Sequence, residues 1–364
     1  MTTALGLDIG GANLKAADLD GTVRSIAFPM WRQYRELADR LRDLSWLEQP
    51  DLVGLTMTAE LADCFKSKAD GVGWVIDSVQ HAFPQSEIRI WLTSGEFAEP
   101  DDAVALPELV AAANWHALAT WAGRAVPNGP AILIDTGSTT TDVIPLLDGL
   151  PASAGLNDLE RLQSGELVYT GVRRTPLCSV TDSVTLADRR APVAAEFFAT
   201  SQDVYVLLGS NAEDGSDTDT ADGRPRTIEH SAARLARMLC CDRTELDMTS
   251  LRSLAAQFAT AQRKQIARAV TQVQNRLTQQ LQQLDRDDAD RPPAVIISGS
   301  GGFLAAAAAT DRGLSSQLNL ADSGHETTAG SACAFAVARL VFERCRDDLL
   351  DTVPFQQTDR PSRL

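Results

Sequence analysis

The pattern of apolar and polar residues in the first third of the chain predicts strands and helices in mixed order. Short apolar runs bounded by turn residues are typical of strands, and Asp20-Gly21 is typical of a hairpin. Leucines recur every three or four residues between 33 and 47, which predicts a helix with one buried face. These criteria predict strands over 5–8, 14–19, 22–28, 51–58 and 88–92 and helices over 33–47, 70–83 and 103–121.

The opening pattern returns after a segment rich in chain breakers, 127–130 (PNGP). Residues 131–149 repeat the order of residues 6–21: apolar strand, aspartate, small-residue turn, second strand and Asp-Gly hairpin. This repeat predicts two domains, 1–127 and 128–324, the first completed by a helix within 325–350. The remaining pattern predicts strands over 204–209 and 294–298, helices over 232–238, 251–284 and 325–345, and a polar tail over 351–364.

Length and charge narrow the class of protein. A chain of 364 residues is longer than one simple domain, which indicates more than one hydrophobic core. A net charge of −16 repels polyanions, so we expect neither nucleic acid nor membrane as a partner. The start of the chain lacks the basic and apolar regions of a leader peptide, which predicts a cytoplasmic protein. The oligomeric state, including a homo-oligomer, stays open.

Three turns of small and hydroxyl residues follow apolar strands and are candidates for phosphate binding. Small residues let backbone N–H groups approach a phosphate closely, and hydroxyl groups add donors. Asp8 and Asp135 precede the first two turns, where a carboxylate suits a Mg²⁺ ion that bridges to phosphate. The phosphate-binding candidates are Gly10, Gly11, Asn13, Lys15, Thr136, Gly137, Ser138, Thr139, Gly299, Ser300, Gly301 and Gly302, and the metal-binding candidates are Asp8 and Asp135.

The order of these turns resembles that of a known superfamily. Residues 8–11 (DIGG), 135–139 (DTGST) and 298–302 (SGSGG) resemble the two phosphate loops and the adenosine loop of the acetate kinase, sugar kinase, Hsp70 and actin superfamily. The resemblance implies an α/β fold of two ribonuclease-H-like domains with the ligand in the cleft between them. A Rossmann fold is not expected, because no G-x-G-x-x-G motif opens a helix.

Six segments carry a narrower resemblance. In order they are DIGGANLKAA (8–17), TMTAELADCF (56–65), IDTGSTTTDVIPL (134–146), SGELVYTGVRRTP (164–176), DTDTADGRPRT (217–227) and ARLARMLC (233–240). Together they resemble hydantoinase/oxoprolinase-like proteins of tetrahydromethanopterin- and methanofuran-linked one-carbon metabolism. The resemblance implies a transferase that joins the phenol of γ-glutamyltyramine to an aminomethyl-furanmethanol diphosphate and releases diphosphate. Its partners would be these two small molecules, with Mg²⁺ as cofactor.

Such a reaction needs a base for the phenol, whose pKa lies near 10. Glu60 and Asp63 follow the strand at 51–58, and their spacing would place both on one face of a helix. Glu60 is equally interpretable as an acid in the first turn of that helix, where it would interact with the helix dipole. Asp142 is a third catalytic candidate, with a purely local backbone role as its alternative.

The substrate-binding candidates are Glu166, Tyr169, Arg173, Arg174 and Asp222. Tandem arginines suit a carboxylate or a phosphate, although solvated surface arginines would look the same. Asp222 belongs to the Asp- and Gly-rich segment 210–226, which is interpretable as a substrate-capping loop, a metal site or a solvated acidic loop.

Two other functions compete with the transferase. An ATP-dependent kinase or a hydantoinase/oxoprolinase-like ATPase would bind ATP at the same three turns. A nucleotide-sensing or filament protein is disfavoured, because it would give Glu60 and Asp63 no role. The superfamily resemblance makes one structural prediction: Asp8 and Asp135 should face each other across one cleft, near the Gly299–Gly302 turn.

Overall fold

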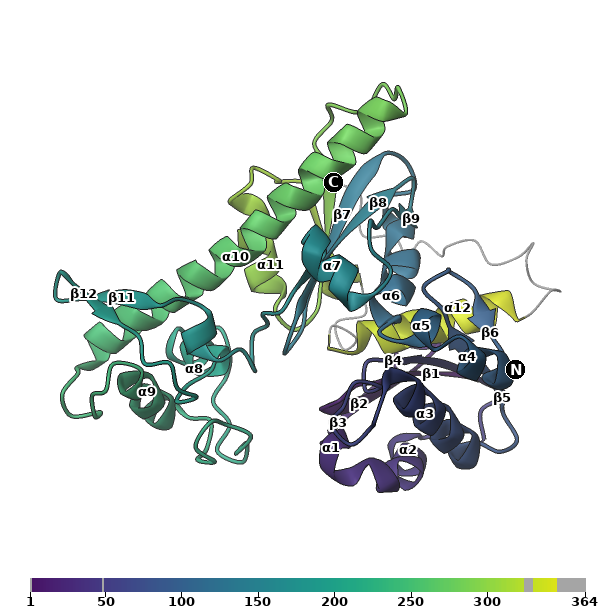
Figure 1. Cartoon of the computed structure of the whole chain (residues 1–364), viewed down its shortest axis with the longest axis horizontal. Helices are drawn as coiled ribbons and strands as arrows, with labels where there is room; N and C mark the ends of the chain where they lie inside the picture. Colours follow the sequence, from purple (N-terminus) through teal and green to yellow (C-terminus); the bar gives the residue numbers. More distant parts are fainter. Residues whose placement is uncertain (1, 48, 324–329, 346–364) are drawn as a thin grey trace.

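The computed structural model describes residues 2–47, 49–323 and 330–345, in which two main β-sheets are each packed against helices (Figure 1). The first sheet has the strand order β3-β2-β1-β4-β5-β6. Its strands are β1 (Ala4–Ile9), β2 (Asn13–Asp18), β3 (Val23–Ala27), β4 (Leu52–Met57), β5 (Glu87–Trp91) and β6 (Phe97–Ala98).

The second sheet has the order β10-β8-β7-β13-β14, and β9 pairs with β8. Its strands are β7 (Pro130–Thr136), β8 (Thr141–Leu147), β9 (Leu150–Pro151), β10 (Leu167–Val168), β13 (Ala294–Ser298) and β14 (Gln317–Asn319). In the first sheet β1 is antiparallel to β2 and parallel to β4. In the second sheet β7 is antiparallel to β8 and parallel to β13. The matching order confirms the duplicated unit and the expected α/β fold.

The helices cover both sheets and follow the apolar stripes of the sequence. Leu37, Leu41 and Leu44 are buried on one face of their helix, as their spacing predicts. In chain order the helices are α1 (Met30–Gln33), α2 (Leu37–Leu44), α3 (Lys68–Ala82), α4 (Pro100–Ala105), α5 (Pro107–Val110), α6 (Asn114–Ala122), α7 (Asp158–Ser164), α8 (Ser201–Leu207), α9 (Ile228–Arg237), α10 (Met248–Gln283), α11 (Gly302–Thr310) and α12 (Ala332–Arg344).

Helices α6 and α12 lie between the two sheets and share one hydrophobic core with both. α12 packs closely on β1 because Gly6 has no side chain: a Cβ there would lie 2.0 Å from the backbone oxygen of Ala334. Trp121 of α6 and Phe335 of α12 meet edge to face at 5.3 Å between ring centroids. The packing of α12 sets the first sheet against the second, and the candidate site lies along this boundary.

The long helix α10 supports the second sheet and a lateral group of elements (Figure 1). Near its N-terminal end it contacts α8, α9 and the hairpin of β11 (Ser183–Leu186) and β12 (Arg189–Pro192). Its buried residues form one core with β7 and β13. Among the helices in the described part of the chain, none combines the length and apolar composition needed to cross a membrane.

Two predictions of secondary structure are wrong. Residues 204–209 belong largely to α8, because Thr200 and Asp203 form a capping box and the apolar run is buried on all sides. The helix predicted over 103–121 is three helices, since Pro107 begins α5 and Ala112 adopts a positive φ of 51° before α6. Residues 332–344 of the predicted last helix are helical as α12, whereas the predicted polar tail, 351–364, lies outside the described residues.

Candidate active site

Two equivalent turns form the centre of the site. The N–H of Gly10 donates to the carbonyl of Asn13 at 2.9 Å, and the N–H of Gly137 donates to the carbonyl of Thr140 at 2.9 Å. Each turn follows a strand that carries an aspartate near its end, Asp8 in β1 and Asp135 in β7. Both aspartates line one cavity of about 410 Å³, the central cavity. This confirms the prediction that they share one cleft.

Most of the predicted phosphate-binding residues line this cavity or the one beside it. Asn13, Lys15, Asp135, Gly137 and Ser138 line both the central cavity and an adjoining side cavity of about 390 Å³. The central cavity also takes in Gly10, Gly11 and Thr139, and the side cavity takes in Gly299 and Ser300. The two cavities therefore meet at the two turns, which is the position expected of a bound phosphate.

The charges at the two aspartates differ. Lys15 Nζ lies 3.2 Å from Oδ2 of Asp8, and the side chain of Asp8 is buried. Burial works against the charged form of Lys15, but the charge and hydrogen bond of Asp8, together with the other acidic groups nearby, raise the pKa of Lys15. Burial and the nearby charge of Asp142 raise the pKa of Asp135 from 3.8 to about 6. One half of the site therefore holds a cation at its aspartate, and the other holds a second carboxylate.

Asp142 is committed to a buried ion pair. Its Oδ1 accepts from Nη2 of Arg161 at 2.6 Å, and both side chains are nearly inaccessible. The guanidinium of Arg161 stacks over the ring of Trp115 at 4.1 Å. Burial raises the pKa of Asp142, and the charge of Arg161 opposes that rise. The structure thus places Asp142 at the cavity wall as the partner of Arg161, which is a poorer position for a base than that of a free carboxylate.

Glu60, like Asp8, is a buried carboxylate of the site with one oxygen that has no hydrogen-bond partner among the described residues. The residue is 2 % exposed and lines the central cavity, and its Oε2 has no hydrogen-bond partner among the described residues. Burial raises its pKa from 4.5 to about 7, against hydrogen bonding to the backbone of Glu60 and Ala112. Asp63 also lines the cavity. The two residues lie in turns before α3, so the prediction that they share a helical face is wrong.

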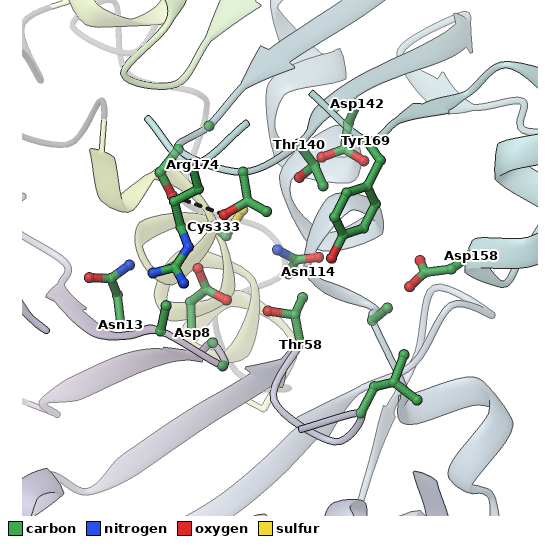
Figure 2. Close-up of a pocket in the computed structure, with 18 of the residues that line it drawn as sticks. Asp8, Asn13, Thr58, Asn114, Thr140, Asp142, Asp158, Tyr169, Arg174 and Cys333 are labelled. Carbon is green, nitrogen blue, oxygen red and sulfur yellow. Dashed lines mark hydrogen bonds between the residues drawn. The ribbon is translucent and has the colours of Figure 1, made fainter. Parts of the chain in front are cut away.

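The tandem arginines point into different cavities. Arg174 lines the central cavity and lies 5.9 Å from the ring of Trp31, which belongs to α1 beside the first sheet. Arg173 lines the side cavity and pairs with Asp217 at 3.0 Å. Tyr169 reaches into the central cavity with its hydroxyl directed inward (Figure 2). The two arginines therefore do not form one binding fork for a single carboxylate.

Several predicted binding residues are structural. Glu166 is fully buried, accepts from the N–H of Ala154 at 2.8 Å, pairs with Arg276 at 2.5 Å and lines neither cavity. Thr136 is buried beneath its turn and also lines neither cavity. A Cβ at Gly301 would lie 2.5 Å from Cγ2 of Thr136, so this glycine permits close packing, and it does not face a ligand. Gly302 likewise lies outside both cavities, at the start of α11.

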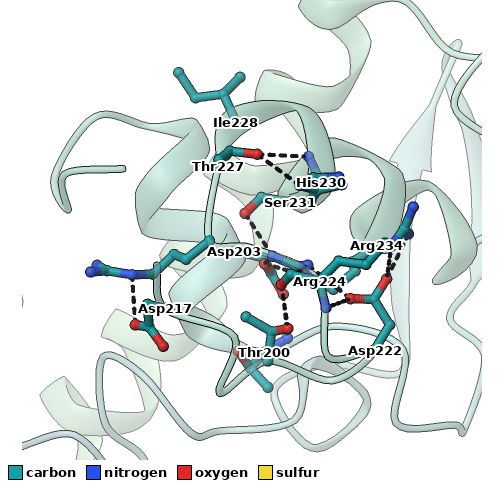
Figure 3. Close-up of polar contacts among 12 residues, drawn as sticks. Thr200, Asp203, Asp217, Asp222, Arg224, Thr227, Ile228, His230, Ser231 and Arg234 are labelled. Carbon is teal, nitrogen blue, oxygen red and sulfur yellow. Dashed lines mark hydrogen bonds and ion pairs between the residues drawn. The ribbon is translucent and has the colours of Figure 1, made fainter. Parts of the chain in front are cut away.

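Asp222 lies away from both cavities and anchors the acidic segment 210–226. Its carboxylate pairs with Arg224 at 2.6 Å and with Arg234 at 2.9 Å (Figure 3). Arg234 is fully buried and also pairs with Asp203 of α8 at 2.8 Å. Burial opposes ionisation of Asp222, but its hydrogen bonds with Arg224 and Arg234 and the charge of Arg234 together lower its pKa to about 2. Through Arg234, Asp222 connects the acidic segment to α9 and α8. The structure therefore gives Asp222 a structural role in place of the predicted substrate binding.

Further residues that the sequence did not predict also line the central cavity. Arg161 and Asp158 come from α7, Asn114 from the start of α6, Trp31 from α1 and Thr58 from the turn after β4. Asp158 precedes Arg161 by three residues, a spacing that signals neighbours on one helix face. The sequence does not indicate that this face of α7 lines the cavity, because the position of α7 depends on the pairing of the following strand, β10, with β8.

Two sheets of matching order, with paired small-residue turns and aspartates at one cavity, form the α/β fold that the resemblance to the acetate kinase, sugar kinase, Hsp70 and actin class predicts. The nucleotide-free structure of an acetone carboxylase shares this fold, with a TM-score of 0.52 and 11 % identity. That alignment covers 93 % of this chain and 70 % of the carboxylase chain. At this identity the likeness shows the fold alone.

The chain belongs to the hydantoinase/oxoprolinase family, which matches residues 51–343. It is 37 % identical over 242 residues to the (4-{4-[2-(gamma-L-glutamylamino)ethyl]phenoxymethyl}furan-2-yl)methanamine synthase of Methanocaldococcus jannaschii, covering 66 % of this chain and 72 % of the relative. The synthase of the same name from Methanococcus vannielii is 37 % identical over 127 residues, covering 35 % of this chain and 57 % of that relative.

Proposed function

We propose that this protein is a transferase that joins a γ-glutamyltyramine-like phenol to an aminomethyl-furanmethanol diphosphate and releases diphosphate. The identity with a synthase named for such an ether product supports the choice of substrates. The observation that carries the chemistry is Glu60, a buried carboxylate with a free oxygen in the cavity that also holds the two turns. This arrangement offers a base and a cradle for a polyanionic leaving group in one place.

The diphosphate would lie between the turns that begin at Gly10 and Gly137. Backbone N–H groups in such turns and the ammonium of Lys15 suit phosphate oxygens. Mg²⁺ fits this position, because Oδ1 of Asp8 is buried without a partner among the described residues and Asp135 lines the same cavity. The described residues contain no group of three acidic, His or Cys side chains arranged for a metal, so diphosphate and water would complete the ligands. Bound Mg²⁺ would offset the charge of the diphosphate.

The coupling step needs one proton transfer and one displacement. The phenol loses its proton to Glu60 as its oxygen bonds to the methylene carbon of the furan donor. The bond between that carbon and the diphosphate oxygen breaks, and the diphosphate leaves with the electron pair. Lys15 and the backbone of the two turns stabilise the charge on the departing oxygens. The leaving group supplies the driving force, so the reaction needs no ATP.

The direct test supplies both substrates with Mg²⁺ and without nucleotide. We expect the ether and diphosphate to form in equal amounts, measured by mass spectrometry and a diphosphate assay. Product that depends on ATP, or diphosphate released without ether, would overturn the proposal.

Glu60→Gln tests the base. In the wild-type protein we expect the coupling rate to rise with pH through about 7, because Glu60 must be ionised to accept the proton. The variant should lose this rise and be slowed most at low pH, since phenolate forms without a base only toward pH 10. Glu160→Gln is the control: this residue lies on α7 outside both cavities. An unchanged pH profile in Glu60→Gln would remove Glu60 from the mechanism.

An ATP-dependent kinase or ATPase is the second candidate, and the side cavity favours it. Gly299, Ser300, Gln202 and Arg226 line a space that opens onto the phosphate turns, where a nucleoside would fit. Ser300→Phe would fill this space from an exposed position. If ATP is a substrate, the variant should raise the KM for ATP at least tenfold. If diphosphate displacement is the activity, coupling should continue in the variant.

A further inference from the structure

The central cavity contains more negative than positive side chains. Six carboxylates line it, and three basic residues oppose them: Lys15, Arg161 and Arg174. Lys15 pairs with Asp8, and Arg161 pairs with Asp142. Arg174 is directed to Asp219 and Trp31. Mg²⁺ beside the diphosphate would neutralise the charge of Asp8 and Asp135. The carboxyl groups of Glu60, Asp63 and Asp158 would remain without a cation from the diphosphate site.

Asp158 lies in the part of the cavity to which Glu60 also belongs. It is the first residue of α7 and its side chain is one-third exposed, and its carboxylate points toward the part of the central cavity that Tyr169 also enters (Figure 2). Nη1 of Arg161 lies 3.9 Å away, while the same guanidinium holds Asp142 at 2.6 Å. The charge of Asp158 acts on Glu60 and disfavours its ionisation. Two carboxylates in electrostatic contact, one with an unpartnered oxygen, call for a cation from the ligand.

An organic cation suits this position better than a metal ion. Two aromatic rings, those of Tyr169 and Trp31, line the same cavity, and aromatic faces attract ammonium groups. A primary ammonium on a short methylene arm can donate three hydrogen bonds in such a site.

We propose that Asp158 binds a primary ammonium group of the substrate, with the ring of Tyr169 beside it. This inference rests on the proposed function, in which the donor carries an aminomethyl group on its furan ring. The name of the Methanocaldococcus jannaschii relative describes a product with a methanamine group on that ring. With the diphosphate at the turns, the ammonium at the far side of the ring lies within the cavity, opposite the leaving group. The γ-glutamyl group of the acceptor also carries a primary ammonium, and the same subsite could bind it by the same interactions.

Binding of fragments tests the subsite without any turnover. Titration calorimetry would compare furan-2-ylmethanamine, glutamate and neutral 2-methylfuran with wild-type protein, Asp158→Asn and Glu160→Gln. Glu160→Gln is the matched control, because it removes one charge from the first turn of α7 outside the cavity, and the Gln oxygen can still accept from Leu156 N–H. We expect Asp158→Asn to weaken furan-2-ylmethanamine binding about 10- to 100-fold and to leave 2-methylfuran unchanged.

Each outcome decides between alternatives. Equal affinity of furan-2-ylmethanamine for wild type and Asp158→Asn would overturn the proposal. Loss of glutamate binding alone would overturn the assignment to the donor and place the acceptor's ammonium at Asp158. Asp158→Ser repeats the test if the Asn variant unfolds, because the N-cap of α7 is Asn157 and stays in place. Because these titrations need no turnover, they can succeed when the coupling assay fails, and the two failures are distinguishable.

The kinetic counterpart measures selectivity. Wild-type protein should prefer a donor with the aminomethyl group over furan-2-ylmethyl diphosphate, and Asp158→Asn should lose this preference through a KM raised about 10- to 100-fold. A fall in kcat with the preference intact would contradict a binding role and leave only a structural one.

Discussion

The two hairpins at the centre of the molecule, β1–β2 and β7–β8, have the same backbone arrangement, but their side chains carry different charges. Both turns are closed by the same hydrogen bond, Gly10 to Asn13 and Gly137 to Thr140. In the first hairpin Asp8 pairs in register with Lys15, and in the second Asp135 pairs in register with Asp142. The comparison shows that the repeated fold provides two similar turns, each a candidate for phosphate binding. The residue opposite the aspartate on the paired strand, Lys15 or Asp142, sets the charge beside each turn.

The second hairpin compensates for its extra carboxylate from outside the repeat. Arg161 belongs to α7, which precedes β10, and β10 pairs with β8 of the second hairpin. The guanidinium of Arg161 neutralises the carboxylate of Asp142. Asp135 keeps a raised pKa because it is buried beside Asp142. Under the proposed function, Lys15 of the first hairpin would bind the anion directly, whereas Asp135 of the second would act through the Mg²⁺ ion that it shares with Asp8.

The largest effect is expected from Asp135→Asn. The change keeps the shape of the side chain and removes the charge that would help to hold Mg²⁺ beside the diphosphate. We expect normal folding and a loss of kcat of about 100-fold or more, measured in the coupling assay. Full wild-type activity in the presence of a metal chelator would contradict this role, and the two hairpins would then not differ in their need for metal.

Asp142→Asn should reduce stability. It leaves Arg161 buried without its ion-pair partner, and breaking a buried pair in this way costs about 3 kcal/mol of unfolding free energy. Urea unfolding would measure the loss. The double variant Asp142→Asn with Arg161→Met removes both charges and should regain much of it. If the single variant is as stable as the wild type, the second hairpin does not depend on α7 for its charge balance.

The smallest effect is a pH-dependent stability difference at Asp135. Folding raises its pKa from 3.8 to about 6, so the folded protein retains a proton that the unfolded chain releases within that interval. Its ionisation therefore opposes folding above pH 6, and the penalty disappears as the pH falls toward 4. Asp135→Asn should melt a few degrees above the wild type at pH 8 and no higher near pH 4, as followed by circular dichroism. A pH-independent difference would mean that burial and the charge of Asp142 do not raise the pKa of Asp135.

Local patterns predicted the strands, the turns and the aspartates well, because each depends on a few adjacent residues. The run from Asp8 to Lys15 and its repeat from Asp135 to Asp142 place their small residues at turns for steric reasons that operate within the hairpin. The assignment of 204–209 as a strand failed because a short apolar run that is buried all round has no period to distinguish strand from helix.

Functional roles were harder to predict where they depend on distant partners. Glu166 and Asp222 have the residue types of a binding site, yet they pair with Arg276 and Arg234 and line neither cavity. Glu60 was identified correctly as a residue of the cavity, but its position before α3 was not. An ion pair between residues far apart in the chain has no local signature, so sequence cannot separate a carboxylate that is paired from one that is free.

The sequence by itself determined the duplicated strand–aspartate–turn–strand unit, its small-residue turns and the family of the protein. Each follows from short-range sterics or from a pattern of residues along the chain. Only the tertiary structure decided which carboxylates face the cavity unpaired, that Arg173 and Arg174 point into different cavities, and that Arg161 and Asp158 belong to the site. The physical reason is that charge pairing and burial depend on distances in space, which the packing of α7 and α12 against the sheets sets.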